Sequence, residues 1–414
     1  MNNIANIILW IVYVLSLFFA IFWFLVLMEG VQKEKKKKLS YFPSVTIAIP
    51  VYNREKSVAL TIDSALALNY PKDKLEIIVV NHGSTDNSKK IIEKYRGKVK
   101  IVNIKRKAGE RKGAPMNVAL KMAKGEFFVC LDADSIATKN ALVDMLPYFE
   151  DKDVGCVLPS MKVYSPKNFW QKLQRTEYLV NMFYKRLMSK INCVHVAPGP
   201  FSIFRTDILR KIGGYDSYNL TEDLELTYKL QQHNYKIIQL LNTEVFTIAP
   251  SSFKEIYAQR NRWFKGAFLN TLKYKKMIFN KKYGDFGFIQ LPSVILSAFI
   301  AISLLIITIY YSLKPHIDFI SNMKFVNFDF VTIIKNISLN FHILDLDYSL
   351  VFIGIVTFLM SSIVLIKSHK YNQEKTLKFG LLPLAVFFLY YYIIMGIAWL
   401  GVAIDFIIGK DRNW

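Results

Sequence analysis

Two carboxylates follow an apolar run in the middle of this sequence. Asp132 and Asp134 stand in LDADS, directly after the run EFFVCL. Two acids separated by one residue at the end of a strand can both face one hard divalent cation, and Mg²⁺ and Mn²⁺ prefer oxygen ligands. Such a cation would neutralise the charge that develops on a departing nucleotide diphosphate. Acidic strand ends are common, so the position of this pair after an apolar strand is what strengthens the signal.

A second acidic group opens an amphipathic pattern further along the chain. Thr221, Glu222 and Asp223 follow the glycine turn IGGYD and begin the pattern EDLELTYKL. One interpretation is structural: a threonine N-cap followed by acids that interact favourably with the helix dipole. The other is catalytic: a carboxylate that takes a proton from a sugar hydroxyl as a general base. The residue types by themselves favour neither interpretation.

Two further groups of polar residues have types that suit a phosphate or a sugar. Gln259, Arg262 and Trp263 stand in QRNRW, where the guanidinium could pair with a diphosphate and the indole could lie against a sugar ring. An arginine and a tryptophan are also typical of a membrane interface. Lys112 precedes a predicted helix in ERKGAPMN, where it could meet a phosphate or be solvated.

All of these residues fall between Ser44 and about Lys276, where short apolar runs alternate with amphipathic stretches. The runs SVTIAIP, LEIIVV, VKIVNI and EFFVCL predict buried strands of a parallel sheet. Helices are predicted between the strands, at 57–68, 88–95, 114–123 and 140–149. This alternation predicts a doubly wound, mostly parallel α/β sheet, which binds ligands at the carboxyl ends of its strands.

Long apolar runs flank this segment on both sides. Residues 4–28 provide about 25 nearly uninterrupted apolar positions, enough to span a bilayer with some tilt. A signal peptide would be shorter and would carry its positive charge before the apolar run, whereas here the lysines follow, at 33–38. Three more spans are predicted, at 288–313, 349–366 and 380–408.

Basic residues beside the spans predict the orientation of the chain. The lysine run and the basic loop KSHKYNQEKTLK are expected on the cytosolic side, with segment 314–347 outside. We expect KYKKMIFNKKYGDF, before the second span, to form an interfacial amphipathic helix rather than a solvated linker. These signals predict a multi-pass protein of the plasma membrane. Its parts are an N-terminal span (1–30), a basic linker (31–43), a cytosolic domain (44–276), and an interfacial helix with about three spans (277–414).

Composition and charge limit the class of protein. The chain has 414 residues, 52% of them hydrophobic, and a formal net charge of +22. The positive charge lies in short runs beside apolar segments, which favours a membrane surface, and no basic-aromatic module predicts nucleic-acid binding. Lysine-rich composition drift is the alternative explanation of much of the excess. The three cysteines lack the spacing of a disulfide framework or a zinc site and are compatible with a reducing compartment.

Taken in order, these motifs resemble an inverting family 2 glycosyltransferase with a GT-A fold. The likeness covers roughly residues 44–264 and rests on IPVYNRE, NHGSTDNS, KGAPMN, LDADS, GPFSIFR, GGYD, TED and QRNRW. TED together with QRNRW is the specific part, and it is typical of the membrane-bound, processive branch. That branch includes the synthases of hyaluronan, chitin, cellulose and poly-N-acetylglucosamine. One span before the catalytic domain and several after it fit the same branch.

The resemblance implies a role for each residue. Asp223 would be the catalytic base, and Asp132 and Asp134 would hold Mn²⁺ or Mg²⁺. The donor nucleotide and its diphosphate would be bound by Pro50, Tyr52, Asn81, Lys112, Asp132 and Arg262, and the acceptor glycan by Glu222, Gln259 and Trp263. An acceptor hydroxyl would attack the anomeric carbon in line, with inversion of configuration.

The sequence departs from the family pattern at two places. Asn81 and His82 stand where the family usually has acids, one of which holds the edge of uracil; an amide or an imidazole can still hydrogen-bond a base. In PVYNRE, Arg54 follows the asparagine and the glutamate comes one position late, as Glu55. The first departure weakens the expectation of a uridine nucleotide, and the second shifts one possible contact.

Three functions remain in competition. The leading hypothesis is a processive β-glycan synthase in the membrane, using a nucleotide-diphosphate sugar that is UDP-linked, with UDP-N-acetylglucosamine as the first candidate. The alternative is transfer of one sugar to a lipid-linked acceptor, which shares the same chemistry. A third is an inactive relative that acts as a membrane scaffold or sugar-nucleotide sensor, for which the two substituted acids are the support. The sequence leaves the sugar, the acceptor, the linkage and the oligomeric state open.

Overall fold

The structure is a computed structural model that describes all residues except 1, 31–36, 324, 326–347 and 410–414. Within the described residues an eight-stranded sheet has the order β3-β2-β1-β4-β7-β6-β8-β5. β1, β2, β3 and β4 are parallel neighbours, and β7 is antiparallel to β4 and β6. The strands are β1 (Val45–Val51), β2 (Leu75–His82), β3 (Lys100–Ile104), β4 (Phe127–Cys130), β5 (Ser135–Ala137), β6 (Val154–Val163), β7 (Ser202–Arg205) and β8 (Lys236–Thr247).

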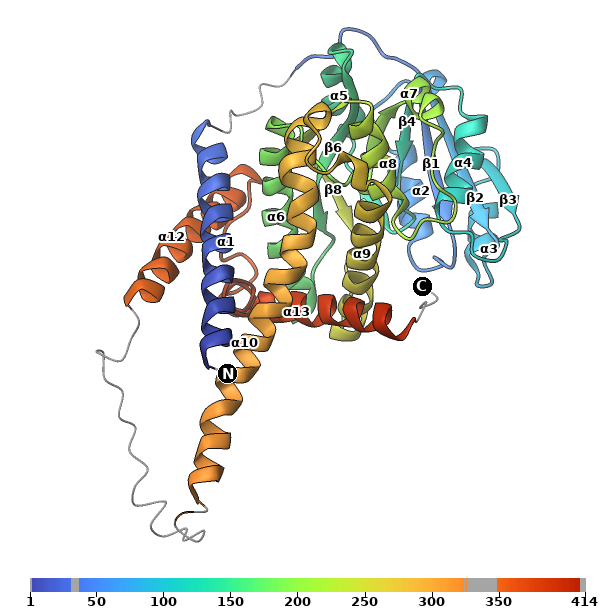
Figure 1. Ribbon diagram of the computed structural model, residues 1–414. Coiled ribbons are helices and arrows are strands. Elements are labelled where there is room, and N and C mark those ends of the chain that lie inside the picture. Colours follow the sequence, from blue (N-terminus) through green and yellow to red (C-terminus); the bar gives the residue numbers. More distant parts are fainter. Residues whose placement is uncertain (1, 31–36, 324, 326–347, 410–414) are drawn as a thin grey trace.

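Helices cover both faces of this sheet (Figure 1). They are α2 (Val58–Leu66), α3 (Ser88–Glu93), α4 (Gly113–Met122), α5 (Ala141–Met145), α6 (Phe169–Lys190), α7 (Thr206–Lys211), α8 (Glu222–Gln232) and α9 (Phe253–Lys273). Successive side chains of a strand point to opposite faces, so Ile47 and Ile49 join the core under α2 and α5, and Ala48 joins the core under α4 and α7. The predicted doubly wound, mostly parallel sheet is confirmed, and its four predicted strands are β1 to β4.

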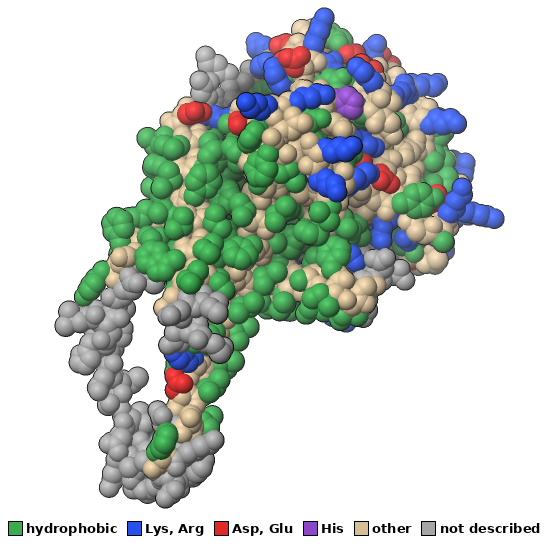
Figure 2. Space-filling view, viewed as in Figure 1, with side chains coloured by type: hydrophobic (Ala, Val, Ile, Leu, Met, Phe, Trp, Pro, Cys, Tyr) green, Lys and Arg blue, Asp and Glu red, His purple; other side chains and the backbone are tan. Residues whose placement is uncertain are grey.

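Four helices of the described chain are long and apolar enough to cross a membrane. They are α1 (Asn2–Met28), α10 (Leu291–Met323), α12 (Tyr348–Tyr371) and α13 (Leu381–Ile408). Hydrophobic side chains gather over α1, α10 and α12 in Figure 2, whereas the charged side chains gather over the sheet domain. Each of the four predicted spans coincides with one of these helices, although α10 continues past the predicted end and through Pro315.

The expected interfacial helix before α10 is wrong for the described chain. After α9 ends at Lys273, the segment forms two short 3₁₀ turns, Lys275–Met277 and Lys281–Tyr283, and a π turn, Phe286–Gln290. Its apolar residues are used inside the domain, because Met277 and Phe286 are buried against Tyr228 and Tyr274. An amphipathic helix would have required those side chains on one outer face. The structure does not describe residues 326–347, which are most of the segment 314–347 predicted on the outer side of the membrane. It also does not describe most of the lysine run at 33–38.

The sheet domain and the apolar helices are joined by close helix crossings. A Cβ at Gly396 of α13 would lie 2.8 Å from the Ala301 carbonyl oxygen of α10. At Gly401 it would lie 2.2 Å from the Tyr257 hydroxyl of α9. Glycine therefore allows α13 to pack directly against both helices, and Phe264 of α9 stacks on Trp399 of α13 beside the second crossing.

Polar contacts tie the loop between α12 and α13 to the sheet. Ser160 of β6 donates to the Asn372 side chain at 2.6 Å, and Asn372 donates to the Leu179 carbonyl of α6 at 3.2 Å. Glu374 forms an ion pair with Arg175 of α6, and both side chains are nearly buried. The loop therefore lies on the same side of the apolar helices as the sheet domain.

Candidate functional site

The carboxyl ends of the central parallel strands bring the predicted nucleotide residues to one edge of the sheet. Pro50 lies near the end of β1, and Tyr52 follows directly after the strand. Asn81 of β2 is in register with Val51, the last residue of β1. β4 ends at Cys130, so that Asp132 emerges from the neighbouring strand at the same edge. The strand order thus assembles residues that are far apart in the sequence.

Lys112 connects two of the predicted acidic motifs. Its Nζ lies 2.5 Å from Asp132 Oδ1 and 3.2 Å from Glu222 Oε1. Burial alone would lower the pKa of Lys112, but these carboxylates raise it well above its usual value. A Cβ at Gly199 would lie 2.3 Å from the Lys112 amine and 2.4 Å from both Asp132 oxygens. The glycine of GPFSIFR therefore makes room for this ion pair.

Thr221 occupies the N-cap position of α8, but its side chain makes no capping hydrogen bond. Its hydroxyl instead accepts from the Asn270 side chain of α9 at 3.1 Å. A Cβ at Gly266 of α9 would lie only 2.3 Å from that hydroxyl oxygen, so glycine allows the helix to approach. The structural interpretation of the motif as a side-chain cap therefore fails for the threonine, although the acids still occupy the first turn of the helix.

The pKa of Asp223 is higher than that of an ordinary aspartate. Burial and then the neighbouring Glu222 raise its pKa to about 6, against the opposing effect of Lys112 and Arg262. Arg262 donates to the Leu220 carbonyl at 3.3 Å, which places the guanidinium beside the start of α8. A carboxyl group with a pKa near neutrality, next to two cations, has the properties required of a general base.

Asp134 is the second acid of the DxD motif, which is formed by Asp132 and Asp134 of LDADS. Arg54 Nε is 3.5 Å from its Oδ2, and both side chains are partly exposed. Burial and the nearby Asp132 raise the pKa of Asp134, since two close carboxylates repel one another. A divalent cation would relieve that repulsion, and oxygen atoms are the ligands it prefers. Among the described residues no cluster of three or more His, Cys, Asp or Glu side chains is arranged to hold a metal. Asp132 and Asp134 are the carboxylates of the described site that could hold a divalent cation.

The two residues at the first departure from the family pattern, Asn81 and His82, already have partners within the protein. Asn81 donates to the Asn103 side chain at 2.8 Å and accepts from the Ser84 amide at 3.2 Å. His82 lies 3.3 Å from a Glu110 oxygen. The strands β2 and β3 thus present a neutral amide pair at the position where an acid was expected.

An exposed aromatic platform stands beside this amide pair. The guanidinium of Arg106 lies over the Tyr52 ring at 4.3 Å from its centroid, and Tyr52 is 42% exposed. An aromatic ring stacked on an arginine offers a flat, partly accessible surface that suits a nucleobase. Sequence reasoning found Tyr52 but missed Arg106.

Glu55, the glutamate that comes one position late in PVYNRE, links two loops of the site. Glu55 accepts from the Asn87 amide and side chain, both at 3.0 Å. Asn53, with a positive φ of 51°, accepts from the Thr85 amide at 2.8 Å. These bonds join the loops that follow β1 and β2, so the shift in the motif preserves their mutual position.

The QRNRW residues lie on α9 and divide into two groups. Arg262 lies beside the start of α8, as described above. Gln259 and Trp263 instead contact Arg260: its Nη1 donates to the Gln259 oxygen at 2.6 Å, and its guanidinium lies 4.3 Å from the centroid of the Trp263 ring. Arg260 is buried, and the sequence analysis had assigned it no role. The sequence signal that could have identified Arg260 is its place within QRNRW.

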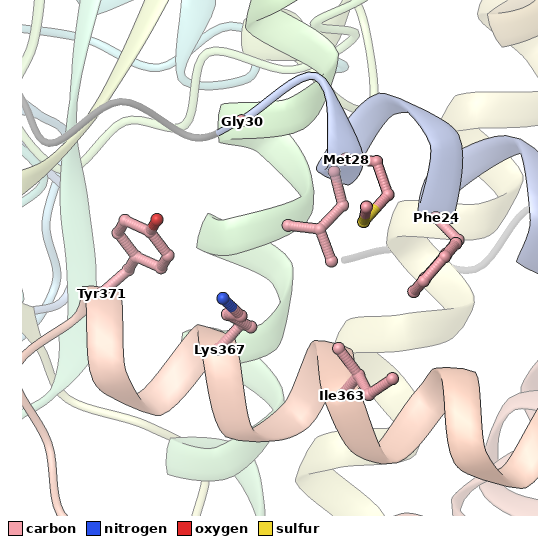
Figure 3. A pocket seen from close by; sticks show the side chains of 7 residues that line it. Phe24, Met28, Gly30, Ile363, Lys367 and Tyr371 are labelled. Atoms are coloured by element: carbon pink, nitrogen blue, oxygen red, sulfur yellow. The ribbon is translucent and has the colours of Figure 1, made fainter.

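A pocket of about 370 Å³ lies elsewhere, between the end of α1 and α12. Figure 3 shows Lys367 and Tyr371 of α12 on one side, with Phe24 and Met28 of α1 across from them. The predicted site residues do not line this pocket, and its walls are mainly apolar. The chemistry-bearing side chains of the described chain gather instead at the strand ends.

The sequence from residue 46 to residue 213 matches the profile of the family described as Glycosyl transferase family 2. Residues 46–213 form a family 2 glycosyltransferase domain. The match begins in β1, contains the DxD motif, and ends at the glycine turn before α8. TED and QRNRW lie beyond it, so the geometry described above is what joins them to the family 2 domain.

Curated relatives and a solved structure resemble the chain more widely. It is 27% identical over 242 residues to the poly-β-1,6-N-acetyl-D-glucosamine synthases of Staphylococcus epidermidis and Staphylococcus aureus (strain COL). The match covers 56% of this chain and 58% of each relative. The mannosyltransferase PcManGT from Pyrobaculum calidifontis, solved in complex with GDP-Man and Mn²⁺, aligns with a TM-score of 0.59 at 17% identity over 99% of both chains. This structural likeness identifies the fold of the family 2 domain as GT-A-like.

Proposed function

We propose that this protein transfers a sugar from a nucleotide-diphosphate sugar to a growing β-glycan, with inversion, at the cytosolic face of the plasma membrane. The observation that carries the proposal is the Lys112 bridge between Asp132 and Glu222, because it joins the DxD and TED motifs into one charged site. The synthases to which the chain is similar are named for N-acetylglucosamine. UDP-N-acetylglucosamine is therefore the first donor to test.

The donor would lie along the strand ends, with its base against Tyr52 and Asn81 and its diphosphate between Lys112 and Arg262. Both cations pair with phosphate oxygens readily. Asp132 and Asp134 would hold Mn²⁺ or Mg²⁺ together with diphosphate oxygens. When bound, that cation stabilises the negative charge of the leaving group.

Asp223 is proposed as the base. It would take the proton from an acceptor hydroxyl while that oxygen forms a bond to the anomeric carbon and the bond from this carbon to the diphosphate oxygen breaks. Its pKa of about 6 leaves it mostly ionised at neutral pH and still basic enough to accept a proton. The leaving nucleotide diphosphate would be held by Lys112 and Arg262.

The acceptor would approach from α9, where Glu222, Gln259 and Trp263 would contact the glycan. α9 packs against α13, as the stack of Phe264 on Trp399 illustrates. An acceptor site next to an apolar helix suits a polymer that crosses the membrane. It also suits a lipid-linked acceptor, which keeps single-sugar transfer to a lipid as the second candidate.

The test is incubation of the detergent-purified protein with Mn²⁺ or Mg²⁺ and a panel of UDP- and GDP-sugars, followed by sizing of the products. A polymer supports the proposal, and one sugar on an added lipid acceptor supports the second candidate. Chelation by EDTA should stop either reaction. No transfer and no nucleotide release with any donor would contradict both and favour the inactive relative.

A further inference from the structure

Arg260 is a buried cation that the proposed chemistry does not use. Its side chain is 1% exposed and lies in α9, one residue after Gln259. Its Nη2 is 2.6 Å from Glu177 Oε2 of α6, a carboxylate that is 6% exposed. Its Nε lies 3.5 Å from the Tyr391 hydroxyl of α13. One guanidinium thus contacts side chains of two other helices, one from the sheet domain and one from the apolar group.

The same guanidinium also contacts two residues of the proposed acceptor site. It donates to the Gln259 amide oxygen at 2.6 Å and lies over the Trp263 ring at 4.3 Å. The hydrogen bond fixes the orientation of the amide, because its oxygen must face Arg260 and its NH₂ group must face away. The stacking fixes the plane of the indole. Both contacts restrict the orientations of Gln259 and Trp263 while Arg260 stays in place.

We propose that Arg260 is a positioning residue for the acceptor: held by Glu177, it orients Gln259 and Trp263 and thereby sets the affinity for the glycan. The inference rests on the proposed function, since it assigns the acceptor to those two side chains. Arginine is suited to this task because its planar group can hydrogen-bond at its edge and stack on its face at the same time. A lysine in its place could form the ion pair but not both of the other contacts.

A purely stabilising role predicts different behaviour. Buried ion pairs often add little net stability, and apolar residues of similar volume can replace both partners without loss, whereas removing one partner leaves an unpaired buried charge. The double variant Glu177→Leu/Arg260→Met should therefore fold about as well as the native protein. It removes the hydrogen bond to Gln259 and the stack on Trp263, so it separates stability from positioning.

The experiment compares the native protein, Glu177→Leu/Arg260→Met and Arg260→Lys. The measurements are the thermal midpoint, the KM for donor, the KM for an oligosaccharide acceptor, and the binding of a fluorescently labelled N-acetylglucosamine oligosaccharide without donor. We expect the double variant to keep its thermal midpoint and donor KM. Its acceptor KM and oligosaccharide Kd should rise by about tenfold, which corresponds to about 1.4 kcal/mol. Arg260→Lys should raise the acceptor KM in the same direction.

A folded double variant with native acceptor KM and native oligosaccharide affinity would overturn the positioning role and leave the proposed function intact. Equal losses in donor and acceptor KM would also overturn it, because they indicate a general distortion. A native protein that neither turns over any donor nor binds the oligosaccharide would overturn the proposed function, and the positioning role with it. If the double variant does not fold, Arg260→Lys decides by the same ratio of acceptor KM to donor KM.

Discussion

At the residue scale, the charges of the site are balanced inside the protein. Lys112 lies between Asp132 and Glu222, and Arg54 lies near Asp134. In the proposed function, a donor diphosphate at Lys112 would compete with these carboxylates. A divalent cation on Asp132 would release the lysine for the phosphate, so we expect metal and donor to bind more tightly together than separately.

The first prediction concerns Asp223 itself. Asp223→Asn keeps the shape of the side chain but cannot accept a proton, so transfer should fall by about 10²- to 10⁴-fold, the usual contribution of a general base. Donor binding, measured by calorimetry with the metal present, should change little. Loss of donor binding in this variant would contradict the role of Asp223 as base and indicate a structural role.

The second prediction concerns pH. The proposed base, Asp223, can accept a proton only when ionised, so kcat/KM should fall as the pH drops below its pKa of about 6. The negative charge of Glu222 raises that pKa, whereas Lys112 and Arg262 lower it. Glu222→Gln should therefore move the acidic limb of the pH profile to lower pH. Asp153→Asn, which removes an exposed acid far from the site, is the matched control. An acidic limb that stays in place in Glu222→Gln would show that another group is titrating.

At the scale of elements, α9 is the helix that carries the proposed acceptor residues Gln259 and Trp263. α9 is held from two directions: Gly266 lets it approach Thr221 at the start of α8, and Gly401 lets α13 approach its Tyr257. The helix therefore contacts the start of α8, the helix that carries Asp223, on one side and an apolar helix on the other. Any displacement of α13 would be expected to reach the acceptor side of the site through α9.

The third prediction tests the packing of α13 on α10. Gly396→Ala adds a Cβ 2.8 Å from the Ala301 carbonyl oxygen, a backbone atom that can move only with its helix. Overpacking of this kind costs about 1–3 kcal/mol, so the midpoint of thermal unfolding in detergent should fall. Gly354→Ala in α12 is the control, because a Cβ there would have no neighbour within 4 Å. Equal behaviour of the two variants would mean that the helices do not pack closely at Gly396.

At the scale of the whole molecule, a buried ionic network holds the sheet domain against the loop that joins α12 and α13. Glu374 of that loop pairs with Arg175 of α6 and lies 3.8 Å from the Lys162 amine of β6. All three side chains are nearly buried. Because removal of one partner leaves an uncompensated charge, the network makes separation of the domain from the loop costly.

The fourth prediction follows from this contact. The three native cysteines are buried and free, so an introduced surface cysteine should dominate labelling by a membrane-impermeant maleimide. Lys375→Cys, in the loop, and Asp153→Cys, in the sheet domain, should be labelled only after the cells are permeabilised. Ser321→Cys, near the far end of α10, should be labelled in intact cells. Labelling of Lys375→Cys in intact cells would contradict the proposed cytosolic orientation.

The sequence by itself determined the elements whose signals are local. Apolar runs defined the strands β1 to β4 and the four long apolar helices, because burial of a continuous run depends mainly on its own residues. A family 2 domain and a GT-A-like fold were predicted from the order of the motifs, and the family match over residues 46–213 and the structural likeness confirm both. The roles of individual site residues stay predictions.

Tertiary structure decided what depends on partners distant in the sequence. The segment after α9 has an amphipathic composition, but Met277 and Phe286 are buried in the domain, so the expected interfacial helix does not form. The sequence suggests Thr221 as a side-chain cap of α8, but its hydroxyl instead accepts a hydrogen bond from Asn270 of α9. Arg260 has no role that its motif alone predicts, and its burial depends on an ion pair with Glu177 of α6. In each case the side chain could lie at the surface or be buried against another element. Only the packing of elements that are distant in the sequence decides between the two.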